Sequence, residues 1–436
     1  MVNKKFNYLW TEAKKLIPGG NMLLSKRPEM FSPKMWPAHF SKSKGCYVWD
    51  INNKKYIDVS LMGVGTNILG YSNRLVDKKV SNAIKKGTMS TLNCPEEVEL
   101  AKTLVKIHPW DGMVKFSRTG GEASAIAIRI ARAHTKKDIV LACGYHGWHD
   151  WYLASNLRGK KNLNKHLLNN TLFKGVPKNL KKTISMFEYN NYESFKKEFY
   201  KNKKNISAVI MEVSRNFPPE NNFLKKIKRL CYLNNIVLIF DECTSGFRET
   251  FGGLHLKYKV NPDIVLYGKA IGNGYPITAI VGKRKIMQKA QDTFISSTFW
   301  TDRIGPTAAL ETLKQMKKVS SWKIITNKGR FIKKEWNNIF KRYDLDVIIS
   351  GLDALPIFRF NNKFHLKYKT FITEQMLKKG YLATNSIYLS TAHTDKILKR
   401  YLNDFEKVIK KLKQSISNRK IKLSGSVCHS EMKRVN

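Results

Sequence analysis

Short apolar runs alternate with amphipathic stretches along the middle of the chain. Helical patterns separate most of the runs, and the stretch 223–233 gathers its apolar residues on one helical face. Such an alternation is typical of a largely parallel sheet covered by helices, so the sequence predicts an α/β fold. The runs that we interpret as strands cover residues 139–142, 184–187, 208–211, 236–240, 264–267 and 278–281.

The two ends of the chain follow other patterns. Residues 1–16 have a helical pattern that Pro18 and two glycines stop, and residues 45–58 are typical of a hairpin. Beyond about residue 320, helical patterns that include 371–379 and 394–415 accompany two short strands, at 347–349 and 356–360. We therefore predict an N-terminal segment 1–70 that packs with the small domain, a large domain 71–320, a small C-terminal α+β domain 321–417 and a mobile basic tail 418–436.

The chain is strongly basic, with 79 Lys and Arg against 33 Asp and Glu and a formal net charge of +46. A basic surface can bind nucleic acid or another polyanion. The lysines are nevertheless scattered in twos and threes, whereas proteins that bind nucleic acid favour clustered arginines interleaved with aromatic residues. We interpret the charge as solvated surface without a nucleic-acid partner, and keep a polyanion-binding protein on an inactive enzyme fold as an alternative.

The sequence lacks the motifs of several other classes of protein. No apolar run approaches the length of a membrane span and the N-terminus has no signal-peptide core, so we expect no membrane association. The six cysteines include no CxxC pair, which favours reduced thiols in a cytoplasmic protein. Neither HExxH nor GxxxxGK[ST] occurs, and we expect no metal.

Two of the predicted strands end in groups of opposite charge. The run 236–240 leads into Asp241 and Glu242, and the run 264–267 leads through Gly268 into Lys269. The ligand crevice of an open α/β sheet lies at the carboxyl ends of its strands, so both groups should face one pocket. A carboxylate and an amine in one pocket suit a cofactor with a cationic ring nitrogen and an aldehyde, which is the chemistry of pyridoxal phosphate.

Residues 114–123 have the pattern of an anion site. A predicted strand is followed by Thr119, Gly120 and Gly121, and a long helix starts there. A helix start combines free backbone N–H groups with the positive end of the helix dipole, so an anion binds there. Two glycines before a helix also occur in ordinary tight turns, and this pattern alone leaves both interpretations open.

The stretch 240–269, FDECTSGFRETFGGLHLKYKVNPDIVLYGK, resembles the class III, fold type I aminotransferases, and within them the glutamate-1-semialdehyde aminomutase group. Similar motifs occur along nearly the whole chain, among them LIPGG at 16–20, GYHG at 144–147 and STAHT at 390–394. The resemblance implies a large domain with a mostly parallel seven-stranded sheet, a smaller C-terminal α+β domain, and pyridoxal 5′-phosphate as the cofactor.

The resemblance assigns roles to residues at matching positions. Asp241 is expected to pair with the protonated pyridine nitrogen, and Lys269 to form a Schiff base with the cofactor and then to move a proton. The phosphate is expected on Thr119, Gly120 and Gly121, where the family usually has Ser-Gly-Thr. Because Gly121 lacks the usual hydroxyl, part of the phosphate grip must come from the backbone or from elsewhere.

Further matching positions surround this expected cofactor. Tyr145 matches the residue that stacks on the cofactor ring, with His146 beside it. Cys243 stands where the family usually has Val against the other face of the ring. Glu212 matches a carboxylate near the substrate, and Asn216 accompanies it.

The resemblance also implies an active site shared between two chains. Thr298 lies in the segment SSTFWT at 296–301 and matches a threonine that in relatives reaches the phosphate of the neighbouring subunit. We therefore expect a homodimer.

Two reactions on small-molecule substrates stay open: amino transfer from a donor to a carbonyl acceptor, and aminomutation of glutamate-1-semialdehyde to 5-aminolevulinate. The mutases bind the substrate carboxylate with an Arg after Pro-Gly-Gly, where this chain has Lys26 in direct register and Arg27 beside it. The segments around Gly63 and Trp300 also differ from the mutases. Because a bidentate Arg binds a carboxylate best, these differences favour an aminotransferase for another carbonyl substrate, such as a sugar or other specialised metabolite.

Overall fold

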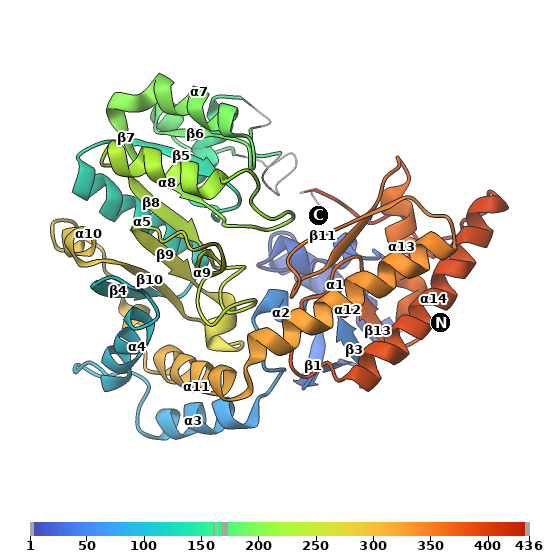
Figure 1. Ribbon diagram of the computed structural model, residues 1–436. Coiled ribbons are helices and arrows are strands. Elements are labelled where there is room, and N and C mark those ends of the chain that lie inside the picture. Colours follow the sequence, from blue (N-terminus) through green and yellow to red (C-terminus); the bar gives the residue numbers. More distant parts are fainter. Residues whose placement is uncertain (1–3, 160–161, 165, 167–172, 432–436) are drawn as a thin grey trace. The chain divides into compact units, whose positions relative to one another are not determined.

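The computed structural model describes residues 4–159, 162–164, 166 and 173–431. The chain divides into two compact units (Figure 1). Unit 2 is the continuous stretch Arg74–Trp322, and unit 1 combines Met1–Asn73 with Lys323–Asn436. Among the described residues, no helix has both the length and the apolar character needed to cross a membrane.

Unit 2 is built on a sheet in which seven strands are described. They are β4 Gly112–Ser117, β5 Ile139–Cys143, β6 Ile184–Met186, β7 Ile206–Met211, β8 Val237–Asp241, β9 Ile264–Tyr267 and β10 Thr278–Lys283. Their order across the sheet is β4-β10-β9-β8-β7-β5-β6. β10 is antiparallel to β4 and β9, and the remaining neighbours are parallel. The predicted α/β fold with a mostly parallel seven-stranded sheet is therefore confirmed.

Helices connect these strands and cover the sheet. The helices of unit 2 are α3 Arg74–Lys85, α4 Pro95–Val105, α5 Gly120–Thr135, α6 Asp150–Leu153, α7 Tyr192–Asn202, α8 Phe223–Leu233, α9 His255–Tyr258, α10 Arg284–Met287 and α11 Ile304–Val319. α5 packs along β7, β8, β9 and β10, and α7 and α8 pack beside each other (Figure 1). Every residue of β7, β8 and β9 is buried. Because successive strand residues point to opposite faces, both faces of the central sheet are covered.

Short 3₁₀ helices occur in the connections of unit 2. They are η3 Ala154–Leu157, η4 Lys178–Lys182, η5 Lys203–Asn205, η6 Lys269–Gly272, η7 Gln288–Gln291 and η8 Thr298–Thr301. Two of them, η6 and η8, begin at residues that the sequence predicts for the active site.

Unit 1 contains two small sheets. β1 Phe40–Lys44, β2 Tyr47–Asp50, β3 Lys55–Val59 and β13 Tyr381–Ala383 form the first, and β11 Val347–Ser350 pairs with β12 Ile357–Phe360 in the second. The antiparallel pairing of β2 with β3 confirms the predicted hairpin. The helices of this unit are α1 Lys4–Leu16, η1 Leu24–Lys26, η2 Pro28–Met30, α2 Met62–Gly65, most of α12 Ser321–Arg342, α13 His365–Lys378 and α14 Asp395–Ser417.

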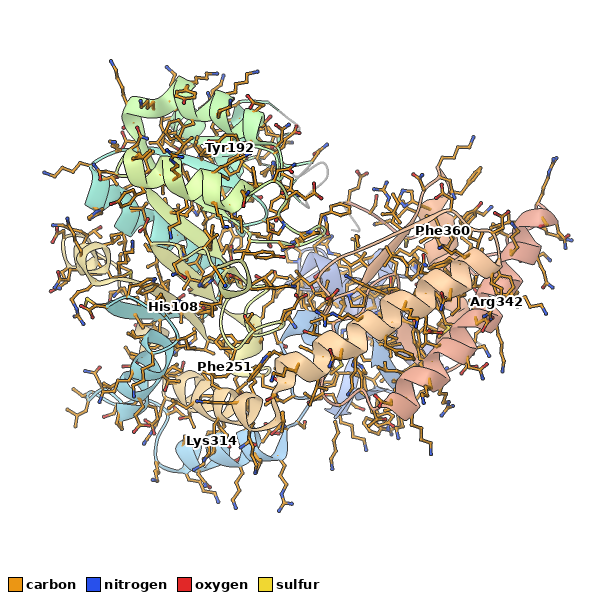
Figure 2. The ribbon with its side chains drawn as sticks, viewed as in Figure 1. His108, Tyr192, Phe251, Lys314, Arg342 and Phe360 are labelled. Atoms are coloured by element: carbon orange, nitrogen blue, oxygen red, sulfur yellow. The ribbon has the colours of Figure 1, made fainter. Side chains whose placement is uncertain are left out.

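Aromatic side chains hold α12, β12 and α14 of unit 1 together. Trp336 and Phe358 lie edge to face with ring centres 4.9 Å apart, and Phe358 and Phe405 lie 5.7 Å apart. At the end of α12, Arg342 forms an ion pair with Glu406 of α14 (Figure 2). Aromatic pairs in this geometry add about 0.5–1.5 kcal/mol beyond the area that they bury, so the cluster fixes the two long helices on the small sheet.

The C-terminal segment differs from the prediction. The backbone N–H of Ser424 donates to the carboxylate of Glu374 at 2.8 Å, and that of Cys428 donates to the hydroxyl of Thr370 at 2.9 Å. Cys428 is 3% exposed. The prediction of a mobile tail is therefore wrong for residues 424–428, because hydrogen bonds and a buried side chain fix them on α13. Residues 432–436 lie outside the described part of the chain.

Candidate active site

The candidate active site lies in unit 2, where β8 and β9 end beside each other. The two strands are parallel neighbours, with Asp241 opposite Leu266. β9 ends one residue later, and Gly268 and Lys269 follow directly. Lys269 has φ 43°, in the left-handed region that is uncommon for residues with a Cβ and that occurs at functional sites. The chain thus brings a carboxylate and an amine to one edge of the sheet, as the sequence predicted.

The carboxylate of Asp241 is buried and held on both oxygens. Oδ1 accepts a hydrogen bond from the backbone N–H of Cys243 at 3.1 Å, and Oδ2 lies 2.8 Å from Nδ1 of His146. The other ring nitrogen of His146 donates to the carbonyl of Cys143 at 3.1 Å. Burial by itself would raise the pKa of Asp241, but His146, the N–H of Cys243 and the charge of Lys269 outweigh it and lower that pKa. A buried carboxylate in ionised form requires a cationic partner.

The amine of Lys269 is held by one hydroxyl group. Its Nζ donates to Oγ1 of Thr244 at 2.9 Å, and the same oxygen accepts a hydrogen bond from Nη2 of Arg215 at 3.2 Å. Thr244 follows Asp241 by three residues. The end of β8 therefore supplies the buried carboxylate, and the turn after it supplies the acceptor for the amine. A single hydroxyl therefore links the amine of Lys269 to a guanidinium.

Arg215 belongs to the candidate site although its sequence context does not predict it. Its Nε and Nη2 donate to Oε1 of Glu212 at 2.9 and 2.6 Å, and its guanidinium lies over the ring of Tyr145 at 6.0 Å. The other carboxylate oxygen of Glu212 accepts from the backbone N–H of Tyr145 at 3.1 Å. Asn216, a predicted site residue, is exposed. The one signal for Arg215 was its place three residues after a strand-end Glu, which is weak in so basic a chain.

The residues of the predicted anion site lie at the start of α5. Oγ1 of Thr119 accepts from the N–H of Glu122 at 3.3 Å, and the carboxylate of Glu122 accepts from the N–H of Thr119 at 2.8 Å. This capping box fixes the first turn of the helix. The backbone N–H groups of Gly120 and Gly121 form no hydrogen bond with the described residues. Two free donors at the positive end of the helix dipole are suited to an anion.

Cys243 joins the anion site to the lysine. A Cβ placed on Gly120 would lie 3.4 Å from Sγ of Cys243, and a Cβ placed on Gly268 would lie 3.3 Å from the same atom. Both glycines therefore lie against the thiol of Cys243, one at the start of α5 and the other directly before Lys269. The anion site, the amine and the buried carboxylate are therefore parts of one site, and they fit the phosphate, the aldehyde and the ring nitrogen of pyridoxal phosphate.

The segment around Trp300, which differs from the mutases, is bound to the anion site. Nε1 of Trp300 donates to the carboxylate of Glu122 at 3.3 Å. The guanidinium of Arg118 donates to Asp302 at 2.6 Å and to the carbonyl of Trp300 at 2.9 Å. These contacts fix residues 300–302 beside the first turn of α5.

Besides Asn216, three predicted residues have no described contact with these groups within unit 2. Thr298 is exposed at the start of η8, and its contact with a neighbouring subunit stays a prediction. Lys26 and Arg27 belong to unit 1. Lys26 is exposed, and Arg27 packs so closely against Gly19 that a Cβ there would lie 1.9 Å from its Nη2. The substrate contacts predicted for Lys26 and Arg27 also stay predictions.

Comparison with known proteins matches this chain to one family model, class III aminotransferase, over residues 31–385. A glutamate-1-semialdehyde 2,1-aminomutase of Wigglesworthia glossinidia brevipalpis is 32% identical over 95% of this chain and 99% of its own. A 3-aminobutyryl-CoA aminotransferase of Cloacimonas acidaminovorans is 31% identical over 94% of this chain and 96% of its own. The solved FumI protein of Sphingopyxis sp. MTA144, in a PLP-containing form, has a TM-score of 0.86 at 22% identity and covers 95% of this chain and 98% of its own.

Proposed function

Because the chain belongs to the class III aminotransferase family, we propose that it moves an amino group from a small-molecule donor to a carbonyl compound other than glutamate-1-semialdehyde, such as a sugar or another specialised metabolite. The enzyme depends on pyridoxal 5′-phosphate. The observation that carries the proposal is the meeting of Asp241 and Lys269 at the ends of two neighbouring strands.

Each group of the site has a part in such a transfer. Bound pyridoxal phosphate supplies an aldehyde that combines with amines and a ring that withdraws electrons from the substrate. Asp241, held ionised by His146 and Cys243, is suited to face the cationic ring nitrogen. Lys269 supplies the amine for the aldehyde and a base for the proton at the reacting carbon. Thr244 fixes the position of that amine.

Glutamate-1-semialdehyde aminomutase is the second candidate function. Full-length relatives at 32% and 31% identity carry that name. The guanidinium of Arg215 donates to the same hydroxyl, that of Thr244, as the amine of Lys269. A guanidinium so close to the amine also favours a substrate that bears a carboxylate. Against it stands the segment after Pro18, where Lys26 occupies the place of the Arg that the mutases use.

The cofactor assignment is tested by the colour of the purified protein. We expect wild type to show a visible absorbance band after incubation with pyridoxal phosphate and removal of the excess, because Lys269 binds the aldehyde covalently. Lys269→Ala should lose both the band and all measurable amino transfer. Lys285→Ala, which changes an exposed lysine of the same unit, is the matched control and should keep both. A wild type without the band would refute the proposal.

Supplying one substrate at a time separates the two reactions. We expect no 5-aminolevulinate from glutamate-1-semialdehyde alone, and amino transfer when an amino donor is combined with a suitable member of a ketone and aldehyde panel. Turnover of glutamate-1-semialdehyde without a second amino donor would establish the aminomutase and reject the first candidate. The same panel identifies the acceptor.

The active enzyme is proposed to be a homodimer. Thr298, whose match implies contact with a second chain, stands beside two large exposed apolar side chains, Phe294 at 82% and Phe299 at 72% exposure. Exposed apolar side chains of this size are typical of surfaces that another chain covers. Sedimentation should give twice the chain mass, and Phe299→Lys should weaken the dimer and its activity together. A fully active monomer would refute this part of the proposal.

A further inference from the structure

One loop of unit 2 contacts Glu212, the buried carboxylate of Asp241 and the start of α5. Residues 144–149 include Tyr145, whose N–H binds Glu212, and His146, which binds Asp241. The loop then crosses the start of α5, where a Cβ on Gly147 would lie only 2.8 Å from Cα of Gly121. Gly147 has φ 98°, which a residue without a Cβ adopts readily. The close backbone approach brings the next residues of the loop onto the anion site.

His149 occupies the space that a side chain at position 121 would need. A Cβ on Gly121 would lie 2.8 Å from both Cε1 and Nδ1 of His149. The indole of Trp148 stacks on the imidazole, with ring centres 4.6 Å apart and planes at 27°. Gly121 and His149 are therefore complementary in shape, because the missing side chain of one leaves room for the ring of the other.

The imidazole of His149 has an unused polar atom. Nδ1 is buried and has no hydrogen-bond partner among the described residues. Buried polar atoms in native structures are nearly always paired, so an unpaired one beside a ligand site indicates a missing ligand atom. The guanidinium of Arg118, the other strong donor at this helix start, is already bound to Asp302 and to the carbonyl of Trp300.

We propose that the imidazole of His149 is a ligand of the cofactor phosphate at the start of α5, in the place that a side-chain hydroxyl at position 121 would otherwise take. The inference rests on the proposed function, because it requires pyridoxal phosphate in this site. The backbone N–H groups of Gly120 and Gly121 supply the rest of the grip. A neutral imidazole carries one N–H and an imidazolium two, so the ring donates a hydrogen bond to the phosphate in either form.

The test compares two cofactor forms that differ only in the phosphate. The dissociation constants of pyridoxal 5′-phosphate and of pyridoxal are measured on full-length apoprotein by absorbance titration. In His149→Ala we expect the constant for pyridoxal phosphate to rise about tenfold, the worth of one hydrogen bond to a charged group, and the constant for pyridoxal to stay unchanged. His134→Ala, which changes a histidine in the last turn of the same helix, is the matched control and should leave both constants unchanged.

Replacing Gly121 and His149, singly and together, tests whether the two residues are complementary in shape. Gly121→Thr alone should weaken binding of pyridoxal phosphate, because its Cβ meets the imidazole of His149. The double variant Gly121→Thr, His149→Ala removes that clash and restores a hydroxyl, so it should bind pyridoxal phosphate more tightly than either single variant. The ³¹P chemical shift of the bound phosphate should change in His149→Ala and not in His134→Ala.

Two outcomes would overturn the inference. Equal weakening of pyridoxal phosphate and pyridoxal in His149→Ala would show a structural role of the ring, and unchanged constants in both would show no role. A wild type that binds pyridoxal phosphate while His149→Ala keeps its affinity refutes this inference alone. A wild type that binds no pyridoxal phosphate refutes the proposed function and this inference with it.

Discussion

Asp241 and Glu242 are adjacent acids that each meet a buried histidine, yet they serve different regions of unit 2. Asp241 is 5% exposed and its partner His146 is 1% exposed. Glu242 and its partner His255 are both fully buried, with Oε1 of Glu242 2.9 Å from Nδ1 of His255. The distances and the chemistry of the two pairs are nearly equal, so the surroundings must account for the difference in role.

The side chains of the two pairs have different surroundings. The carboxylate of Asp241 lies in the field of Lys269, at the edge that also holds the anion site. Glu242 accepts from the backbone N–H of His255 at 2.9 Å and from the hydroxyl of Ser245, and the ring of His255 stacks on that of His108. One acid therefore lies at the proposed cofactor site, while the other ties the loop after β8 to the core. A buried acid–histidine pair is a functional group only where a ligand can reach it.

Replacing Asp241 should have the largest effect on activity. Asp241→Asn keeps the shape and can still accept the N–H of Cys243, but it removes the charge that a cationic ring nitrogen requires. We expect kcat/KM for amino transfer to fall by about 10²–10³-fold, the usual cost of one preorganised electrostatic group, while the protein stays folded. Steady-state kinetics with circular dichroism as the folding control measures both. An Asp241→Asn variant with near-normal kcat/KM would show that Asp241, like Glu242, has no part in the reaction.

Replacing Glu242 should affect stability and leave the chemistry unchanged. Glu242→Gln removes a charge whose hydrogen-bond partners are all buried, which leaves at least one donor of His255 or Ser245 without a good acceptor. We expect the free energy of unfolding to fall by about 1–3 kcal/mol and kcat/KM of the folded protein to change less than about twofold. Urea denaturation at fixed cofactor concentration measures the first quantity. A large loss of kcat/KM without a loss of stability would show that Glu242 also acts on the ligand.

Most of the fold could be predicted from the sequence because its strands are strongly apolar. The helix Phe223–Leu233 begins and ends at the predicted residues, and each described strand of the large sheet overlaps a predicted run. The chain gave weaker local signals for α3, where apolar positions alternate with many polar ones, and for β13, a strand of three residues. β13 is held by parallel pairing with β3, which is distant in sequence, so its own residues do not predict it.

The residues of the candidate site also differ in how well the sequence predicts them. Asp241 and Lys269 could be found because Asp241 directly follows an apolar run and Lys269 follows another after one glycine. Arg215 depends on contacts with Thr244 and Glu212, and His149 on the space left by Gly121, so both become visible only when separate segments are placed together. The prediction of a mobile C-terminal segment is wrong for another reason. Its polar sequence predicts solvent exposure, but backbone N–H groups of Ser424 and Cys428 donate hydrogen bonds to α13, and these do not depend on the type of the segment's own side chains.

The smallest effects should come from Thr244 and Ser245, the two hydroxyl residues that follow the acids. They allow the same comparison between a residue of the candidate site and a residue of the core. Thr244 binds Lys269, whereas Ser245 binds Glu242. Thr244→Val keeps the volume but leaves the amine without its acceptor, so kcat/KM should fall about fivefold to tenfold at nearly unchanged stability. Ser245→Ala should lower the free energy of unfolding by about 1 kcal/mol at unchanged kcat/KM. Measuring both quantities on both variants completes the test, because a reversed pattern would mean that Thr244 does not belong to the site or that Ser245 does not belong to the core.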